Sequence, residues 1–424
     1  MSVADWAQAI ALGVERQDGD VLARLFSLHT KSTRRALATI ADPSERVVKA
    51  VLTRVALPSP WSDMTVSYVR CGALLFGHAS KRQAPSEAWH QAFEALQAAA
   101  SVFLRHFLVL APGRWALPLL RALMLDVRWV AKRADEAANA AAPPGTRRAQ
   151  AHLEACARTL NRGFSACVAD RHPVLHESKK WGTYAMVNLV FGTYFALKSI
   201  SLCKNIVRAL DAGDLPPLSA YAAVDVVPFL YYQGRLAFMD EEYTKADEAL
   251  TLALMQTPHT APTLRERILL YLIPVRLLHG QRPNAQLLAP FPRLEALYAH
   301  VLEACRRGDV RTLDQTLSDA AYERPFVRLG VFLALERVRA VCITRLLRRV
   351  WRHEGGGTRL RLAPMAQALQ WIGAADDALG AEWLIATQIA QGRIKGYVAH
   401  ERQMLVLSAN DPFPCASLTM LRTL

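Results

Sequence analysis

Cysteine pairs and long uninterrupted apolar runs are both missing from this sequence. None of its seven cysteines has a partner at C-x-x-C spacing, so we expect reduced thiols that mostly fill a core in the cytosol or nucleus. The most apolar stretch, residues 102–130, carries four arginines and an aspartate. It is too interrupted to span a bilayer, and the first six residues carry no basic segment of a signal peptide. We therefore expect no membrane insertion.

Motifs that support catalysis are also missing. The chain has no G-x-x-x-x-G-K-[ST], no G-x-S-x-G and no H-E-x-x-H. The run Gly355–Gly357 lacks the Lys and Ser/Thr of a nucleotide site, which favours a flexible loop. His172 and His176 share a segment with Glu177 but have no third ligand nearby, which favours a surface loop over a metal site. We expect neither an enzyme nor a bound cofactor.

Positive charge and apolar residues are in excess. The net charge is +14 and 52% of the 424 residues are hydrophobic. Such a charge favours acidic partners, which are nucleic acid, an anionic membrane or an acidic polypeptide. The length is enough for two to three domains or for one continuous helical array.

Helical periodicity covers most of the chain. Residues 1–140 predict an N-terminal helical region of unassigned function, including a helix Pro43–Leu57 with Asp42 as its N-cap. The Pro- and Gly-containing segment 139–148 predicts a boundary. Beyond it, Trp181–Leu210 predicts one long helix.

A repeated helical hairpin is predicted in residues 148–335. Small and apolar residues occur at the offsets of a tetratricopeptide (TPR) repeat, with Tyr243 opening the second helix. These residues are Gly234, Ala246, Leu250, Ala253 and Pro258. Gly and Ala let two helices approach closely, and Pro ends the pair. Further hairpins follow to residue 320, so a right-handed solenoid of TPR-like hairpins is expected.

The C-terminal segment predicts a winged helix over residues 336–410, followed by a tail, 411–424. A long helix Pro325–Arg352 leads into it, and Trp371 in the next helix is expected in the core. After the helix Asp376–Gln391, Gly392 is placed for a left-handed C-cap. The period then changes to two, which predicts a two-stranded wing over residues 393–408.

The wing sequence Gly392-Arg-Ile-Lys-Gly-Tyr397 resembles the entry to the wing of PCI domains. Other collinear blocks resemble the PCI domain-containing protein 2 family, and COP9 signalosome subunit 12 is a close relative with the same blocks. They include Ser178–Tyr184, Leu202–Arg208, Tyr231–Arg235, Leu270–Val275, Gly330–Leu333 and Asn410–Pro414. The resemblance implies an all-α fold, a right-handed solenoid of TPR-like helical hairpins capped by a C-terminal winged helix (PCI domain). The first 140 residues match only weakly.

Arginine is concentrated in one stretch, residues 337–361, which has eight arginines against a single acid. Arg345, Arg348, Arg349 and Arg352 recur at i, i+3, i+4 and i+7, so they predict one helix face opposite the apolar stripe. Such a face is either solvated or binds an acidic partner, and the missing interspersed Glu favours binding. The other candidate phosphate contacts are Arg359, Arg361, Arg393, Lys395 and Arg402.

Acidic residues in the predicted third helix of the winged unit argue against base reading. That helix enters the major groove in sequence-reading proteins, yet here it carries Asp376, Asp377 and Glu382. We therefore expect contact with RNA or DNA backbone without strong sequence preference.

The resemblance also implies partners and a place in the cell. It implies a non-enzymatic scaffold subunit of a nuclear transcription-and-export complex for mRNA, located in the nucleus and at nuclear pores, with some cytoplasmic protein. The implied partners are a large scaffold protein related to germinal-centre-associated nuclear protein and the small acidic protein shared with the proteasome lid. The alternative is a COP9 signalosome-type subunit that works only through protein contacts.

Overall fold

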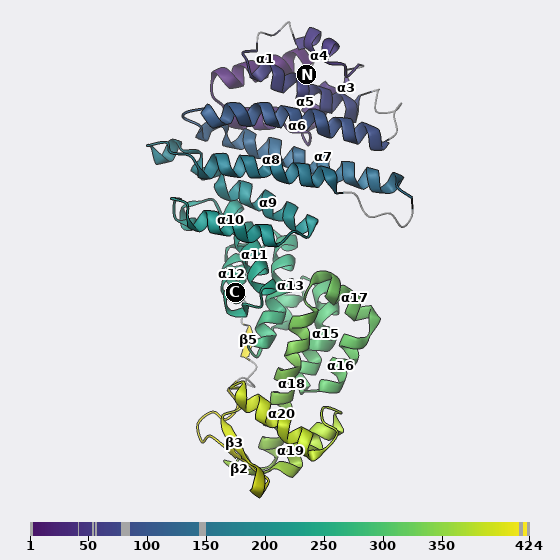
Figure 1. Cartoon of the computed structure of the whole chain (residues 1–424), viewed down its shortest axis with the longest axis vertical. Coiled ribbons are helices and arrows are strands. Elements are labelled where there is room, and N and C mark those ends of the chain that lie inside the picture. The colour runs from purple at the N-terminus through teal and green to yellow at the C-terminus, as the bar shows by residue number, and fades with distance from the viewer. Residues whose placement is uncertain are drawn as a thin grey trace. The chain divides into compact units, whose positions relative to one another are not determined.

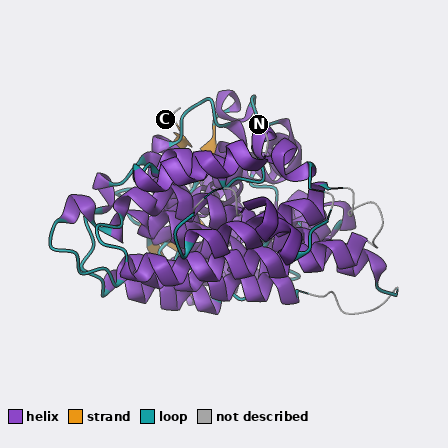
Figure 2. Cartoon of the chain, turned by 90° about the horizontal axis from the view of Figure 1, so that it is seen from above, coloured by secondary structure: helices purple, strands orange, loops and turns teal. Residues whose placement is uncertain are grey.

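The computed structural model of this chain describes residues 3–40, 42–52, 55, 57–77, 85–143, 150–414 and 419–421. Helices account for nearly all of its regular structure (Figure 1, Figure 2). Its contacts group into two compact units, Met1–Phe229 and Leu230–Leu424, divided within helix α11 (Ala223–Met239). The domain boundaries drawn from the sequence stay predictions.

The first unit is a succession of packed helices. They are α1 (Val3–Glu15), α2 (Gly19–Leu25), α3 (Lys31–Ala38), α4 (Glu45–Leu52), α5 (Trp61–Phe76), α6 (Pro85–Val109), α7 (Leu117–Ala141), α8 (Ala151–Val168), α9 (Thr183–Leu197) and α10 (Ser201–Asp211). Short 3₁₀ turns are η2 (Arg114–Ala116), η3 (Leu175–Glu177), η4 (Lys179–Gly182) and η5 (Leu218–Ala220). From α5 to α9, each helix packs on the next in sequence (Figure 1).

An aromatic cluster around a buried acid forms the core near the N-terminus. Trp6, Phe26 and Tyr68 are fully buried, with the Phe26 and Tyr68 ring centroids 5.0 Å apart. The Asp126 carboxylate accepts hydrogen bonds from the Tyr68 hydroxyl at 3.0 Å and the Leu28 amide at 2.8 Å. Burial raises the pKa of Asp126 to about 7.

One helix in the described part of the chain, α6, is long and apolar enough by length and composition to cross a membrane. Half of its most apolar stretch is buried inside the fold, where α6 packs against α5, α7 and α8. Core helices commonly have this composition, so packing accounts for the apolar character of α6.

The second unit begins with helical hairpins and ends in a winged helix. Its helices after α11 are α12 (Tyr243–Gln256), α13 (Pro262–Leu278), α14 (Ala285–Leu288), α15 (Pro292–Arg307), α16 (Val310–Ser318), α17 (Ala320–Leu329), α18 (Phe332–His353), α19 (Leu362–Trp371) and α20 (Ala378–Ala390). Its strands are β1 (Gln281–Pro283), β2 (Arg359–Arg361), β3 (Gly396–Ala399), β4 (Met404–Leu407) and β5 (Thr419–Leu421), with a 3₁₀ turn η6 (His400–Arg402). β1 and β5 pair in parallel.

The predicted winged helix is confirmed. Strands β2, β4 and β3 form an antiparallel sheet in that order beside α19 and α20. Asp377 caps α20 by accepting from the Gly380 amide at 2.6 Å, and Gly392 follows the helix with φ +69°. A Cβ at Gly396 would overlap the Val406 carbonyl oxygen, so the second glycine of the wing motif permits close strand pairing.

The winged helix is joined to the hairpins through packing as well as through the chain. Helix α18 contacts α13, α15 and α16 among the hairpins and α19 of the winged helix. The predicted all-α solenoid with a winged-helix cap is therefore confirmed. Tyr243 opens α12, as the repeat pattern predicts.

Three predicted helices are wrong in detail. Trp181–Leu210 is two helices, because Lys198 takes a left-handed conformation with φ 59° and ends α9. Pro325–Arg352 is also two helices, because Gly330 with φ +75° ends α17 before α18 begins. The predicted helix Pro43–Leu57 starts later, because α4 begins at Glu45, and the Asp42 carboxylate accepts from the amide of Ser44, the residue before α4. Residues 53, 54 and 56 of that prediction lie outside the described residues.

Candidate nucleic-acid interface

Four predicted arginines lie on α18 and define the α18 arginine face: Arg345, Arg348, Arg349 and Arg352. Arg349 and Arg352 are exposed, whereas Arg345 and Arg348 are half-buried. The two half-buried arginines are those nearer the start of α18, a helix that packs against α13, α15 and α16. The four share one helix face, but Arg345 and Arg348 are only partly exposed.

Arg345 is a cation in a crowded positive environment. Burial, followed by the charges of Arg349 and Arg282, lowers the pKa of its guanidinium. Its buried Nη1 atom has no hydrogen-bond partner among the described residues. An anion at the nearby surface would offset the repulsion between these like charges.

Arg349 is exposed but also makes a contact that supports the fold. Its Nη1 donates to the carbonyl oxygen of Arg307, the last residue of α15, at 2.5 Å. Carbonyls at a helix C-terminus lack intrahelical partners, so Arg349 caps α15. Burial and the charge of Arg352 lower the pKa of the neighbouring Arg348 guanidinium. The Asp411 carboxylate acts in the opposite direction.

The strand after α18 extends the set of exposed arginines. Arg359 and Arg361 in β2 are both exposed, with Leu360 buried between them, and β2 pairs with β4. Lys395 precedes β3 and Arg402 lies in η6, and both are exposed. These cations belong to the winged helix, on the strands and turns that surround β4.

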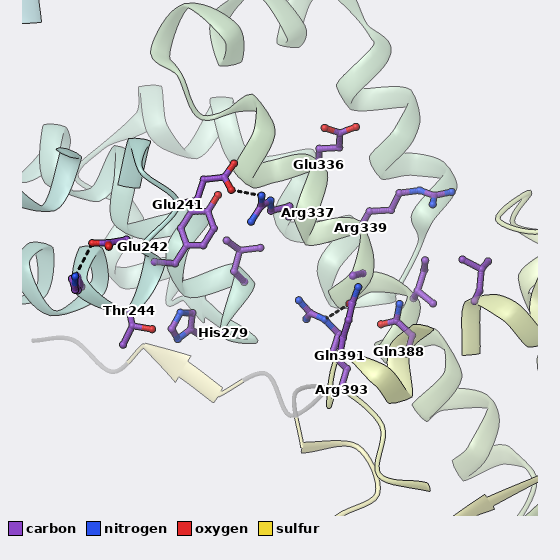
Figure 3. A pocket seen from close by; sticks show the side chains of 16 residues that line it. Glu241, Glu242, Thr244, His279, Glu336, Arg337, Arg339, Gln388, Gln391 and Arg393 are labelled. Atoms are coloured by element: carbon purple, nitrogen blue, oxygen red, sulfur yellow. Dashed lines mark hydrogen bonds and ion pairs between the residues drawn. The ribbon is translucent and has the colours of Figure 1, made fainter. Parts of the chain in front are cut away.

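Arg393 is the predicted residue that the structure separates from the others. It is half-buried and lines a cavity together with Arg337 and Arg339 of α18 (Figure 3). At 100° per residue, Arg337 and Arg339 lie outside the arc occupied by the α18 arginine face. Arg393 is therefore placed for a different contact.

The cavity around Arg393 has a volume of about 990 Å³ and was not predicted from the sequence. Its residues come from distant segments: Glu241, Glu242, Tyr243, Thr244, Lys245, Leu278, His279, Glu336, Arg337, Arg339, Ala340, Ile343, Leu384, Gln388, Gln391 and Arg393. Arg337 pairs with Glu241, and Lys245 pairs with Glu242 at 3.0 Å (Figure 3). Four cationic side chains line it against three carboxylates, so the cavity is close to neutral rather than strongly basic. The adjacent acids Glu241 and Glu242 are the feature of the sequence that could have pointed to it.

An apolar surface on the winged helix was also missed. Trp371 was expected in the core, yet it is 75% exposed at the end of α19. That expectation is wrong because helical spacing alone does not show which side of a terminal turn is covered. On α20, Leu379 and Trp383 lie one turn apart and are 65% and 75% exposed. The Arg311 guanidinium lies 5.7 Å from the centre of the Trp371 ring.

The histidines predicted to lie in a surface loop do so. His172 precedes η3 and His176 lies in it, and they approach Glu177 at 3.8 and 3.6 Å. Within the described ranges, no group of three or more His, Cys, Asp or Glu side chains is arranged to hold a metal ion.

Comparison with known proteins agrees with this architecture. A family model described as PSMD3-like, N-terminal TPR repeats, matches residues 173–296. A "Protein CSN12 homolog" of Mycosarcoma maydis is 39% identical over 100% of both chains, and one of Neurospora crassa is 36% identical over 84% of both. "PCI domain-containing protein 2" of Danio rerio is 27% identical over 98% of both chains.

The fold and these matches define the class first: this is a PCI-domain scaffold protein built from TPR-like hairpins and a winged helix. More specifically, the chain belongs to the family of CSN12 homologues and PCI domain-containing protein 2. The relatives named here carry no enzyme name.

Proposed function

We propose that this protein is a scaffold subunit of a nuclear, transcription-coupled mRNA-export complex that also contacts nucleic-acid backbone. The observation that carries the nucleic-acid part is the α18 arginine face, where Arg349 and Arg352 are exposed. Phosphate oxygens match these exposed cations, since they are anionic acceptors. The acids at positions 376 and 377 of the capping turn before α20 favour backbone contact over base reading.

The exposed apolar residues of α19 and α20 support a protein contact on the same unit. Trp371, Leu379 and Trp383 are too exposed to stabilise the fold by burial. Large aromatic side chains are typical of interface hot spots. We assign this surface to a large scaffold subunit, related to germinal-centre-associated nuclear protein. The double variant Trp371→Ser/Trp383→Ser is expected to stay folded and to lose this subunit, whereas Leu333→Ser, a 61% exposed residue of α18, is its matched control.

A small acidic partner of the proteasome-lid type is part of the proposal. The cavity at Arg393 is close to neutral, with four cations against three carboxylates, so the α18 arginine face is the better electrostatic match for an acidic chain. A partner that binds only the folded state raises the unfolding midpoint by mass action, with about 2.7 kcal/mol expected at 100 times Kd. If the unfolding midpoint is unchanged at a saturating concentration of the acidic protein, that protein is not a partner.

A second candidate is a signalosome-type subunit that acts only through protein contacts. It is favoured by the names of the relatives from Mycosarcoma maydis and Neurospora crassa. Affinity purification of the tagged full-length chain, followed by identification of its co-purifying subunits, separates the two. Recovery of the large scaffold subunit together with mRNA supports the export complex. Recovery of signalosome subunits without RNA supports the alternative.

A further inference from the structure

Three aromatic side chains from successive helices line one pocket of the first unit, which we call the aromatic pocket. Phe76 is the last residue of α5, Trp89 lies near the start of α6 and Trp129 lies in α7. These helices pack in sequence order (Figure 1). The Trp89 and Trp129 rings meet edge to face, with centroids 5.4 Å apart and planes at 74°. The pocket has a volume of about 430 Å³, and its other lining residues are Arg34, Leu75, Arg133, Glu136 and Ala137.

The rings of this pocket are open to a ligand. Phe76, Trp89 and Trp129 are all half-buried, in contrast to the fully buried Trp6. The Trp6 indole nitrogen donates to the Leu25 carbonyl oxygen at 3.2 Å. The indole nitrogens of Trp89 and Trp129 have no acceptor among the residues that the structure describes. An indole N–H only donates, so a matching ligand presents a carbonyl oxygen beside an apolar surface.

The lining of the aromatic pocket carries one more positive than negative charge. The Arg34 guanidinium carbon lies 5.2 Å from the centre of the Phe76 ring. Arg133 pairs with the Glu136 carboxylate at 3.1 Å. Two guanidinium groups repel a cationic ligand, such as a methylated lysine, and the carboxylate disfavours a phosphodiester chain. This balance leaves a place for one negative charge beside an otherwise uncharged, apolar ligand.

A proline-rich segment combines these properties. In the polyproline II helix, the carbonyl oxygens make no internal hydrogen bonds and the proline rings are apolar. Such segments bind aromatic-lined grooves, and their preformed conformation lowers the entropic cost of binding. Open indole donors and one unbalanced positive charge therefore match a proline-rich segment that has an acidic residue next to its prolines.

We propose that the aromatic pocket binds a proline-rich segment of a partner protein, with an acidic residue beside the prolines. A proline ring packs against Trp89 and Trp129, whose indole nitrogens donate to carbonyl oxygens of the segment. The acidic residue pairs with Arg133, whose side chain is 54% exposed and therefore accessible. This contact lies in the first unit and is independent of the role proposed for the α18 arginine face.

Fluorescence anisotropy on the full-length chain tests the proposal with labelled peptides of equal length. The first has two glutamates before about eight prolines, the second has lysines in place of the glutamates, and the third has alternating glycine and serine in place of the prolines. The variant Trp89→Phe/Trp129→Phe removes both indole donors and keeps an aromatic ring at each position. Its matched control is Trp371→Phe/Trp383→Phe, the same change at two exposed positions of the second unit.

A second variant tests the charge of the pocket. Arg133→Glu replaces the proposed partner of the acidic residue with a carboxylate, and Arg158→Glu, at an exposed position of α8, is its matched control. The parent and Arg158→Glu should prefer the glutamate–proline peptide, whereas Arg133→Glu should prefer the lysine–proline peptide. A residue that only supports the fold would not exchange one peptide for the other.

The parent and both controls are expected to bind the glutamate–proline peptide at least about tenfold more tightly than the glycine–serine peptide. The tryptophan variant should bind it at least about tenfold more weakly, since two hydrogen bonds are lost, with circular dichroism confirming its fold. If the parent binds no proline peptide, or if either site variant binds both proline peptides as the parent does, the proposal is wrong. A labelled thymidine oligonucleotide that the parent binds and the tryptophan variant does not would also overturn it, because the pocket would then take nucleic acid.

Discussion

Gly234 of α11 lies directly against Leu250 of α12. A Cβ atom built on Gly234 would come within 2.6 Å of Leu250 Cγ and 3.2 Å of its backbone nitrogen. The close approach of the two helices therefore depends on the absence of a side chain at position 234. This is the steric requirement that the repeat pattern indicates in the sequence.

Replacing Gly234 with Val should destabilise the second unit. Overpacking a well-filled helix contact costs about 1–3 kcal/mol, since backbone as well as side chain must move. Denaturant unfolding measures this as a lower midpoint. Gln233→Val, at the exposed neighbouring position of α11, should change the unfolding free energy by less than about 0.5 kcal/mol. Equal effects at both positions would contradict the contact.

The sequence predicted those parts of the fold whose cause is local or steric. The hairpin at Gly234 and the wing at Gly392 and Gly396 were predictable because each position needs glycine, either for close packing or for a positive φ. The break at Lys198 was missed because a non-glycine residue there takes φ 59°. Glycine was not needed, so the sequence carried no signal for the end of α9.

The buried carboxylate of Asp126 predicts a pH dependence of stability. Burial raises its pKa from 3.8 to about 7 in the folded protein, so between these pH values the folded chain holds a proton that the unfolded chain has lost. The stability from this proton is present at low pH and is lost as pH rises towards 7. It amounts to at most about 4 kcal/mol, at 1.36 kcal/mol per pKa unit.

Asp126→Asn should remove this dependence, because the amide oxygen still accepts from Leu28 and Tyr68 but does not titrate. Denaturant unfolding from pH 4 to 7 should show a flatter profile for the variant than for the parent. Asp20→Asn, at an exposed position, is the control and should follow the parent. A variant whose profile is parallel to that of the parent would mean that Asp126 is ionised throughout.

Alanine variants of Arg349 and Arg352 should differ in stability, because only Arg349 has a structural contact on the α18 arginine face. Arg349→Ala removes the cap on α15 and should lower the unfolding free energy by about 1 kcal/mol. Arg352→Ala, on the same exposed face, should leave it within about 0.5 kcal/mol of the parent. Thermal or denaturant unfolding of both variants checks this. Equal stability of the two would show that the Arg307 carbonyl is satisfied by water.

The candidate site was predictable as a list of residues but not as a surface. Helical spacing correctly placed Arg349 and Arg352 on one exposed face. It did not show that Arg345 and Arg348, nearer the start of α18, are half-buried, or that Arg393 lines a separate cavity. Both facts depend on contacts between segments distant in sequence. For the same reason the exposed Trp371 was assigned to the core.

Exposed arginines of α18 and β2 are proposed to bind nucleic-acid backbone. The variant Arg352→Glu/Arg359→Glu reverses two exposed positions of this surface. Its matched control is Arg324→Glu/Arg328→Glu, which makes the same charge change at two exposed positions of α17. Both variants alter net charge equally, so any difference between them reports the surface rather than overall charge.

Fluorescence anisotropy of labelled single-stranded RNA and DNA of several sequences, titrated with each protein across a range of salt, is the most direct test. The parent and the α17 control should bind all sequences within a few-fold, with log affinity falling linearly with log salt. The α18–β2 variant should bind about tenfold or more weakly at low salt, with a shallower slope because fewer phosphates are contacted. If it binds as tightly as the parent with the same slope, or if the parent binds no nucleic acid, the claim is contradicted.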